Sequence, residues 1–179
     1  DVSELDVTNL QQIRIYVKSN SINVIINCAA YTAVDQAESE EDKAYLVNAL
    51  APQYLAEVAK EFNCKFIHIS TDYVFDGRNY RPYVETDVPN PLSVYGKTKL
   101  DGEQLIKRVN PEHSIIVRTS WVYSSFGTNF VKTMRKLFQS KESLTIIYDQ
   151  VGTPTYARDL AEAILKIVPQ INNKATETY

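Results

Sequence analysis

The feature that most constrains the fold of this chain is an alternation of short apolar runs with longer amphipathic segments. The β-rich runs predict buried strands, at residues 23–30, 65–70, 114–118 and 144–148. Apolar positions with a helical period predict helices between and after them, at residues 40–62, 95–109, 129–139 and 156–168. Strands that alternate with helices indicate βαβ units, and therefore an α/β fold whose parallel sheet is covered on both faces.

Ligands of such sheets bind beyond the carboxyl ends of the strands. The segments after Asn27, Ile69 and Val117 are therefore the first places to look for a functional site. Residues 71–94, rich in Pro, Asp, Asn and aromatic residues, are expected to form a long loop.

Composition indicates one soluble globular domain spanning residues 1–179, with 44% hydrophobic and 23% charged residues. The net charge of -3 provides no electrostatic reason to expect a nucleic acid or an anionic membrane as partner. No apolar run approaches a membrane span and no signal peptide is visible, so we expect a cytoplasmic protein. Cys28 and Cys64 are expected to be reduced, largely buried thiols rather than a disulfide or a metal site.

The start of the chain resembles the tail of a strand-to-helix turn, with Thr8 or Asn9 as helix cap. The chain has only 5 glycines and contains neither G-x-G-x-x-G nor G-x-x-G-x-x-G. The end is equally abrupt. We therefore expect a fragment that lacks an N-terminal glycine-rich turn and a C-terminal end.

The pattern that carries chemistry is Tyr-x-x-x-Lys at Tyr95 and Lys99, which lie on one face at the start of a predicted helix. A lysine ammonium near a phenol is expected to lower the phenol pKa, which would make Tyr95 a usable proton donor near neutral pH. Thr71 follows a predicted strand, where its hydroxyl can bind the same substrate oxygen. Either motif alone is weak evidence for a catalytic site, because a lysine at this spacing often lies on a solvated helix face and a threonine after a strand often caps a turn. The combination is more specific.

With these motifs the chain resembles the extended short-chain dehydrogenase/reductases, and within that superfamily the dTDP-4-dehydrorhamnose reductases. The segments that carry the resemblance spread over nearly the whole chain: Asn27–Asp35, Glu38–Glu40, Val47–Ala49, Ser70–Gly77, Asn90–Leu100, Arg118–Tyr123 and Asp149–Thr155. The resemblance implies a Rossmann-like doubly wound parallel sheet, incomplete at its N-terminus, whose last part leads into a small substrate-binding region. It also implies NADPH or NADH as cofactor and a nucleotide sugar as substrate.

The resemblance assigns roles residue by residue. Thr71, Tyr95 and Lys99 match the family's catalytic triad, in which Lys99 would also hold the nicotinamide ribose. The cofactor side would comprise Asp6, Val7, Ala29, Ala30 and Tyr31, together with Tyr95 and Lys99. The substrate side would comprise Val34, Asp72, Tyr73 and Trp121, together with Thr71 and Tyr95. Asn48 resembles a helix asparagine that supports the site.

Simpler interpretations stand beside these roles. Asp6 could be a plain turn residue, and Tyr73 and Trp121 could serve core packing alone. His68 is read as a satisfied interior histidine rather than a ligand. The acidic run at residues 38–42 is read as a solvated helix start that suits the helix dipole, and no metal site is predicted.

Three alternative functions share part of this pattern. A dehydratase would need a carboxylate after Thr71-Asp72, and Tyr73 disfavours it. An epimerase is harder to exclude. A regulatory homologue resembling the methionine adenosyltransferase beta subunit would retain the triad without catalysis. The sequence does not determine whether the cofactor is NADH or NADPH, or which nucleotide carries the sugar. It also leaves open whether the protein forms a homodimer and whether a metal binds at a subunit interface.

Overall fold

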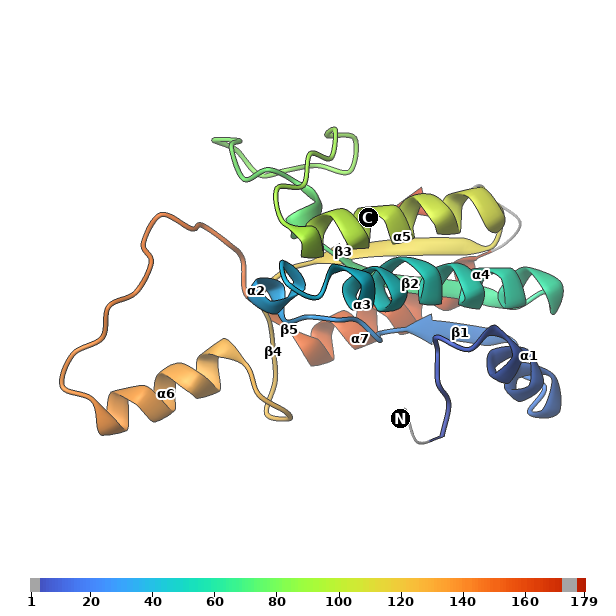
Figure 1. Cartoon of the computed structure of the whole chain (residues 1–179), viewed down its shortest axis with the longest axis horizontal. Coiled ribbons are helices and arrows are strands. Elements are labelled where there is room, and N and C mark those ends of the chain that lie inside the picture. Colours follow the sequence, from blue (N-terminus) through green and yellow to red (C-terminus); the bar gives the residue numbers. More distant parts are fainter. Residues whose placement is uncertain (1–3, 172–176) are drawn as a thin grey trace. The chain divides into compact units, whose positions relative to one another are not determined.

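The computed structural model describes residues 4–171 and 177–179. The chain divides into two compact units, one formed by Asp1–Arg118 with Gln170–Tyr179 and the other by Thr119–Pro169. The elements of both are labelled in Figure 1. The first unit contains the main sheet, and the assignment of residues 1–179 to one domain stays a prediction.

The main sheet of the described residues has four strands in the order β1-β2-β3-β6. They are β1 (Val24–Asn27), β2 (Lys65–Thr71), β3 (Ser114–Thr119) and β6 (Glu177–Thr178). β1 pairs with β2 and β3 pairs with β6, both in parallel. The α/β class and the first three strands are thereby confirmed. β6 was not predicted, since a strand of two residues is too short to produce a periodic pattern.

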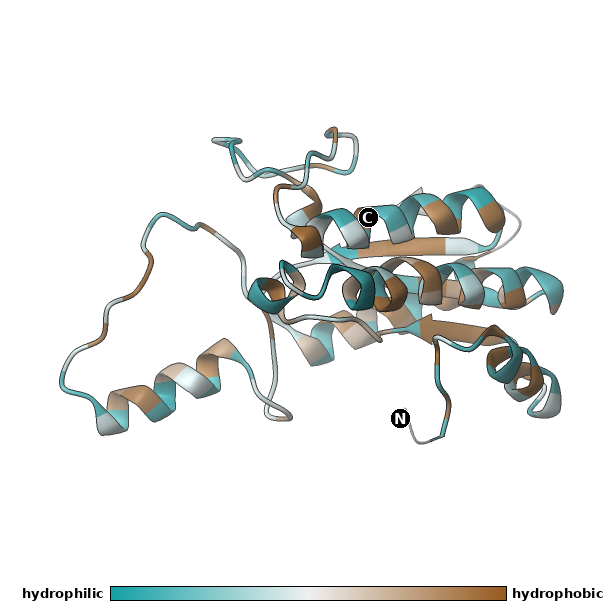
Figure 2. Ribbon diagram, viewed as in Figure 1, coloured by the Kyte–Doolittle hydropathy of each residue, from teal (hydrophilic) through white to brown (hydrophobic). Residues whose placement is uncertain are grey.

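Two long helices, α4 (Ala51–Glu61) and α5 (Val94–Val109), lie side by side over one face of this sheet (Figure 1). Their apolar sides and the strands enclose the main core, which Figure 2 shows as brown bands on the strands and brown patches along the helices. The largest fully buried members of this core are Ile13, Val58, Phe66, Ile106 and Ile116. This burial explains why the helical period was readable in the sequence.

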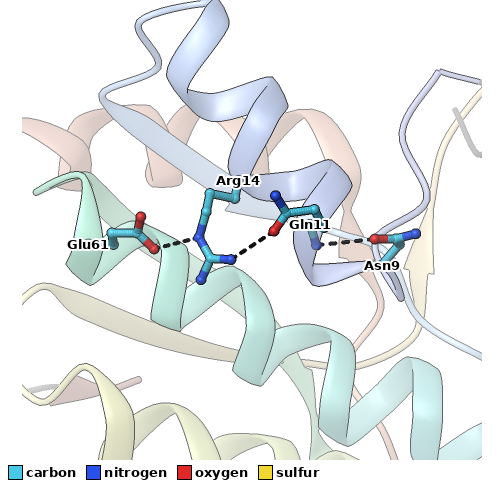
Figure 3. Close-up of polar contacts among 4 residues, drawn as sticks. All are labelled: Asn9, Gln11, Arg14 and Glu61. Carbon is cyan, nitrogen blue, oxygen red and sulfur yellow. Dashed lines mark hydrogen bonds and ion pairs between the residues drawn. The ribbon is translucent and has the colours of Figure 1, made fainter.

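The first helix, α1 (Leu10–Ser19), is capped as its sequence predicts. The Oδ1 atom of Asn9 accepts hydrogen bonds from the backbone N–H groups of Gln11 and Gln12, each at 3.1 Å. Arg14 then ties α1 to α4, because its Nε donates to Glu61 Oε2 at 2.8 Å while its Nη1 donates to Gln11 Oε1 at 3.0 Å (Figure 3). The first turn of α1 is thus capped, and the helix is tied to α4.

The helix predicted at residues 40–62 is confirmed as one run with a widened turn. It consists of α3 (Glu41–Tyr45), the π-helical turn η1 (Leu46–Leu50) and α4. Pro52 has no N–H to donate to the Asn48 carbonyl, so regular α-helical bonding cannot continue there. A short helix, α2 (Val34–Ala37), precedes this run.

Gly102 of α5 lies against the backbone carbonyl of Asn48, and a Cβ at this position would overlap that carbonyl. Replacing Gly102 with Ala is therefore expected to destabilise the protein by about 1–3 kcal/mol, although alanine favours a helix. Urea unfolding measures the change. Gln104→Ala, at an exposed position of the same helix, is the control. Equal stability of the two variants would contradict the tight packing of α5 on η1.

The second unit contains α6 (Phe130–Ser140) and α7 (Ala157–Ile167), followed by the short 3-10 turn η3 (Val168–Gln170), and the two predicted helices are confirmed. A parallel pair of two-residue strands, β4 (Val122–Tyr123) and β5 (Thr155–Tyr156), was not predicted. The strand predicted at residues 144–148 is wrong, because this described segment pairs with no other strand. Its residues have β propensity, but a strand requires a partner for its backbone groups.

Both cysteines are free thiols. Cys64 is buried and donates to the carbonyl of Ile22 at 3.0 Å. Cys28 is exposed, which corrects the expectation of two buried thiols: it follows the end of β1, where the chain leaves the sheet. Among the described residues, no helix has both the length and the apolar character that a membrane crossing needs.

Candidate active site

The candidate site lies where β2 ends and α5 begins. Thr71 is the last residue of β2, and the 3-10 turn η2 (Asp72–Val74) follows it. Ser93 caps α5 by accepting a hydrogen bond from the Gly96 N–H at 3.1 Å. Glu38 also accepts from the Val94 N–H at 2.8 Å. These contacts fix the first turn of α5, which carries Tyr95.

Thr71 and Tyr95 are both buried and lie together at this edge. Burial raises the pKa of Tyr95, and a hydrogen bond with Thr71 partly offsets this rise. The direction is opposite to the one expected from the Tyr-x-x-x-Lys spacing. The reason is that the sequence pattern shows the nearby lysine but not the loss of water around the phenol, which disfavours the phenolate.

Lys99 is also buried, with 1% of its surface exposed. Its Nζ donates to the Ile69 carbonyl at 2.7 Å and lies 3.1 Å from Nε2 of His68. Burial lowers the pKa of Lys99 from 10.5 to about 8, against the opposing charges of Glu103 and Cys28. The amine is thus held on the sheet side of the helix and changes its charge close to neutral pH.

This lowered pKa predicts a pH dependence of stability. The unfolded chain binds more protons at Lys99 than the folded one between pH 8 and 10.5, so this residue makes stability rise with pH across that window. Relative to Lys99→Met, the wild-type free energy of unfolding should gain about 3 kcal/mol between pH 7 and pH 10.5. Urea unfolding of both proteins at several pH values measures it, and a pH-independent difference would contradict a lowered pKa.

The segment after β1 is held by two asparagines. Asn27 Oδ1 accepts a hydrogen bond from the Ala29 N–H at 3.0 Å. Asn48 Oδ1 accepts from the Tyr31 N–H at 2.8 Å, and Asn48 Nδ2 donates to the Tyr31 carbonyl at 3.1 Å. Asn48 thus holds the backbone of Tyr31, and its support of a functional site stays a prediction. Because Ala29 is exposed and Ala30 partly so, this fixed backbone is open to a ligand.

Aromatic and apolar side chains surround Tyr95. Tyr31 and Val34 pack against the small buried cluster that contains Tyr95. The ring of Tyr73 meets that of Tyr95 edge to face, with centroids 5.4 Å apart, and 41% of Tyr73 remains exposed. Tyr73 therefore contributes to packing and can also contact a ligand.

A carboxylate lies next to the buried hydroxyl pair. Thr71 Oγ1 donates to Asp72 Oδ1 at 3.2 Å and accepts from the Tyr73 N–H at the same distance. Burial raises the pKa of Asp72, and hydrogen bonds offset this rise only in part. Five of the sequence-predicted positions thus meet at this edge: Tyr31, Val34, Thr71, Tyr73 and Tyr95.

Other predicted residues are engaged elsewhere. Asp6 accepts hydrogen bonds from the hydroxyl and N–H of Thr8, at 2.7 and 2.9 Å, and these bonds lower its pKa. Val7 packs on the main core. Trp121 belongs to the second unit, where its ring meets Phe130 edge to face at 5.6 Å. The packing of Trp121 and the turn contacts of Asp6 leave their ligand roles as proposals.

Sequence reasoning identified His68 as an interior residue but missed its contact with Lys99. It also missed Glu103, which accepts from Ser70 Oγ at 2.6 Å and forms an ion pair with Arg118. No local sequence signal indicated either contact. The register that sets His68 opposite Asn27 is a property of the folded sheet. A carboxylate one turn after a lysine, such as Glu103, usually lies on a solvated helix face.

Comparison with known proteins identifies relatives of the whole chain. The family described as RmlD substrate binding domain matches residues 1–179. The dTDP-4-dehydrorhamnose reductase of Aggregatibacter actinomycetemcomitans is 49% identical over 179 residues, which are 100% of this chain and 60% of that protein. A dTDP-4-keto-6-deoxy-D-glucose reductase of Streptomyces niveus is 41% identical over 92% of this chain and 57% of its own length.

Among solved structures, the dTDP-4-dehydrorhamnose reductase of Bacillus anthracis str. Ames in complex with NADP has a TM-score of 0.94 at 41% identity. This chain is covered completely and spans 63% of that one. The likeness confirms the Rossmann-like fold expected from the resemblance. The chain spans about 60% of the length of the relatives it matches. It belongs to the RmlD family, the family of the dTDP-4-dehydrorhamnose reductases.

Proposed function

We propose that this chain forms most of the catalytic core of a reductase that converts the C4 ketone of dTDP-4-dehydro-L-rhamnose to the alcohol of dTDP-L-rhamnose. The observation that carries the proposal is the buried pair of Thr71 and Tyr95 at the carboxyl end of β2, with Lys99 one turn further along α5. The family of the chain and the identity of its relatives support the same reaction.

The roles of the residues follow from their chemistry. NADPH or NADH supplies the hydride to C4 when bound. Tyr95 donates its phenolic proton to the O4 atom, and the raised pKa keeps that proton on the phenol at neutral pH. Thr71 turns its single hydroxyl hydrogen from Asp72 to the same oxygen, and this hydrogen bond stabilises the charge that develops there. The ketone gains a hydride and a proton, so the products are an alcohol and the oxidised cofactor.

The cofactor fits the residues that are present. Small side chains at Ala29 and Ala30 leave the strand-end backbone accessible, and two asparagines hold that backbone in place. Lys99 is proposed to hold the nicotinamide ribose, while Asp6 and Val7 are proposed to lie near the adenine. Val34, Asp72, Tyr73 and Trp121 are proposed to contact the nucleotide sugar. The choice between NADPH and NADH stays open, although one relative was solved with NADP.

Absorbance of the reduced nicotinamide tests the proposal. The assay compares the chain of 179 residues with a full-length form, in which the chain is joined to the N- and C-terminal segments that complete the length of its relatives. We expect the full-length form to oxidise NADPH or NADH with dTDP-4-dehydro-L-rhamnose. We expect the shorter chain to be silent, because dinucleotide binding in this fold uses a glycine-rich turn.

Two other outcomes would redirect the assignment. Oxidation only with dTDP-4-keto-6-deoxy-D-glucose would move it to the reaction named for the Streptomyces niveus relative. A folded full-length form that binds NADPH or NADH but oxidises neither with either sugar would refute the reductase and favour a non-catalytic regulatory homologue.

A further inference from the structure

Three buried polar side chains from three elements form a chain of contacts behind the candidate site. They are Asn27 at the end of β1, His68 in β2 and Lys99 in α5, and all three are almost fully inaccessible to water. Asn27 Nδ2 lies 3.0 Å from His68 Nδ1, and His68 Nε2 lies 3.1 Å from Lys99 Nζ. His68 therefore contacts a polar group at each of its ring nitrogens.

The orientation of Asn27 determines which ring nitrogen carries the hydrogen. Asn27 Oδ1 accepts from the Ala29 N–H at 3.0 Å, so the amide NH₂ group faces His68 and donates to Nδ1. Burial, together with the charge of Lys99, holds the pKa of His68 well below its ordinary value, and the ring is neutral. A neutral imidazole has one donor and one acceptor, so with the amide in this orientation its hydrogen lies on Nε2, and that tautomer fits only the neutral amine of Lys99.

This arrangement couples the amine of Lys99 to the tautomer of His68. A neutral amine can accept the Nε2 hydrogen while it donates to the Ile69 carbonyl at 2.7 Å. An ammonium has no lone pair, so a charged Lys99 requires the hydrogen on Nδ1 and the amide of Asn27 turned away from Ala29. The other ionisable groups that act on Lys99 are Cys28, after β1, and Glu103, on α5 itself.

We propose that His68 is a positioning residue for Lys99. Together with the Ile69 carbonyl it fixes the amine from the sheet side, and through Asn27 it links the amine to the backbone of Ala29, at the proposed cofactor edge. The catalytic consequence rests on the reductase function proposed above, whereas the chain of contacts can be tested without it. A merely space-filling histidine would need neither the amide at one nitrogen nor the amine at the other.

Nitrogen NMR tests the contacts directly, because the chain has only 2 histidines. In a His113→Asn background, His68 gives the only histidine signals. We expect its ring-nitrogen shifts to report a neutral ring whose hydrogen moves between Nδ1 and Nε2 as Lys99 titrates, and to change when Lys99 is replaced by Met. Shifts that are independent of pH near 8 and of the Lys99 side chain would overturn the proposal.

Two substitutions test the consequence for the site. In His68→Gln the amide reaches the position of Nε2 and can still contact Lys99, whereas in His68→Asn it reaches only the position of Nδ1 and can still contact Asn27. We expect His68→Asn in the full-length form to weaken NAD(P)H binding and kcat/KM by about 10- to 100-fold, the worth of a hydrogen bond to a charged group. His68→Gln should retain most of both.

Equal losses in the two variants, or a larger loss in His68→Gln, would refute a positioning role through Lys99. Unfolding curves establish that each variant is folded, and the NMR result decides the proposal if one of them is not. Failure of the reductase function is recognised separately, because the unsubstituted full-length form would then oxidise no cofactor while the binding and NMR comparisons stay informative.

Discussion

Replacing Tyr95 with Phe is expected to reduce turnover of the full-length form by about 10²–10⁴-fold, the usual contribution of a positioned acid or base. The substitution removes only the hydroxyl, and the ring keeps its place in the buried cluster and its contact with Tyr73. The fold should therefore stay intact. Initial rates of NAD(P)H oxidation measure the effect, at saturating and at low concentrations of the sugar nucleotide.

The two kinetic constants should separate chemistry from binding. If Tyr95 donates its proton in the transition state, kcat and kcat/KM fall together, while KM changes little. Tyr16→Phe, which removes a hydroxyl from the exposed face of α1, is the matched control and should leave the rates unchanged. Near-normal turnover in Tyr95→Phe would show that another group supplies the proton.

Replacing Glu103 with Gln is expected to destabilise the protein by about 3–5 kcal/mol, the usual effect of removing one partner of a buried ion pair. The carboxylate of Glu103 accepts two hydrogen bonds from Arg118, at 2.9 and 2.6 Å, and one from Ser70 at 2.6 Å. Only 1% of the Glu103 side chain and 9% of the Arg118 side chain are exposed.

The loss of stability would arise mainly because Arg118 is left buried without its carboxylate partner. A glutamine has the shape of glutamate, but its NH₂ group would face donors, and the guanidinium would keep its charge with no counter-ion at this position. Contact with the Phe75 ring, 5.0 Å from the guanidinium carbon, cannot replace the carboxylate. The pair links α5 to the ends of β2 and β3, so we expect the candidate site to be affected as well.

Urea unfolding of Glu103→Gln beside Glu61→Gln measures the difference. Glu61 forms an ion pair with Arg14 on the surface, where 43% of its side chain is exposed, and its loss should cost no more than about 1 kcal/mol. The two substitutions make the same chemical change, but Glu103 is buried and accepts three hydrogen bonds, whereas Glu61 is partly exposed and accepts one. Similar destabilisation in both would mean that the inner pair contributes no more than a surface pair.

The sequence by itself determined the class of the fold and most of its elements. A buried face leaves a periodic signal, and for this reason the first three strands and the helices α3, α4, α5 and α7 were readable, whereas the four-residue helix α2 was not predicted. The segment at 144–148 shows the limit of this reasoning, because β propensity does not show whether a partner strand is present. The opposite case is given by β4, β5 and β6. Each has only two residues, too few for a periodic pattern, and is a strand only because it pairs with another strand.

The candidate site was also partly readable. Thr71 and Tyr95 were expected at one edge because the carboxyl ends of parallel strands and the following helix starts meet there. Only the tertiary structure decided their electrostatics. Burial raised the pKa of Tyr95 where the spacing to Lys99 suggested a fall, and it lowered the pKa of Lys99 itself. Loss of solvent depends on everything packed around a group, and no local pattern records it.

The partners of the buried charges were likewise decided by the tertiary structure. Lys99 meets His68 and Glu103 meets Arg118 because a parallel register and a helix packing angle bring distant residues within hydrogen-bonding distance. Sequence alone displays each of these residues as an ordinary member of its strand or helix. Short-range patterns therefore identified the elements and the reacting groups, whereas the long-range contacts determined their charge states and positions.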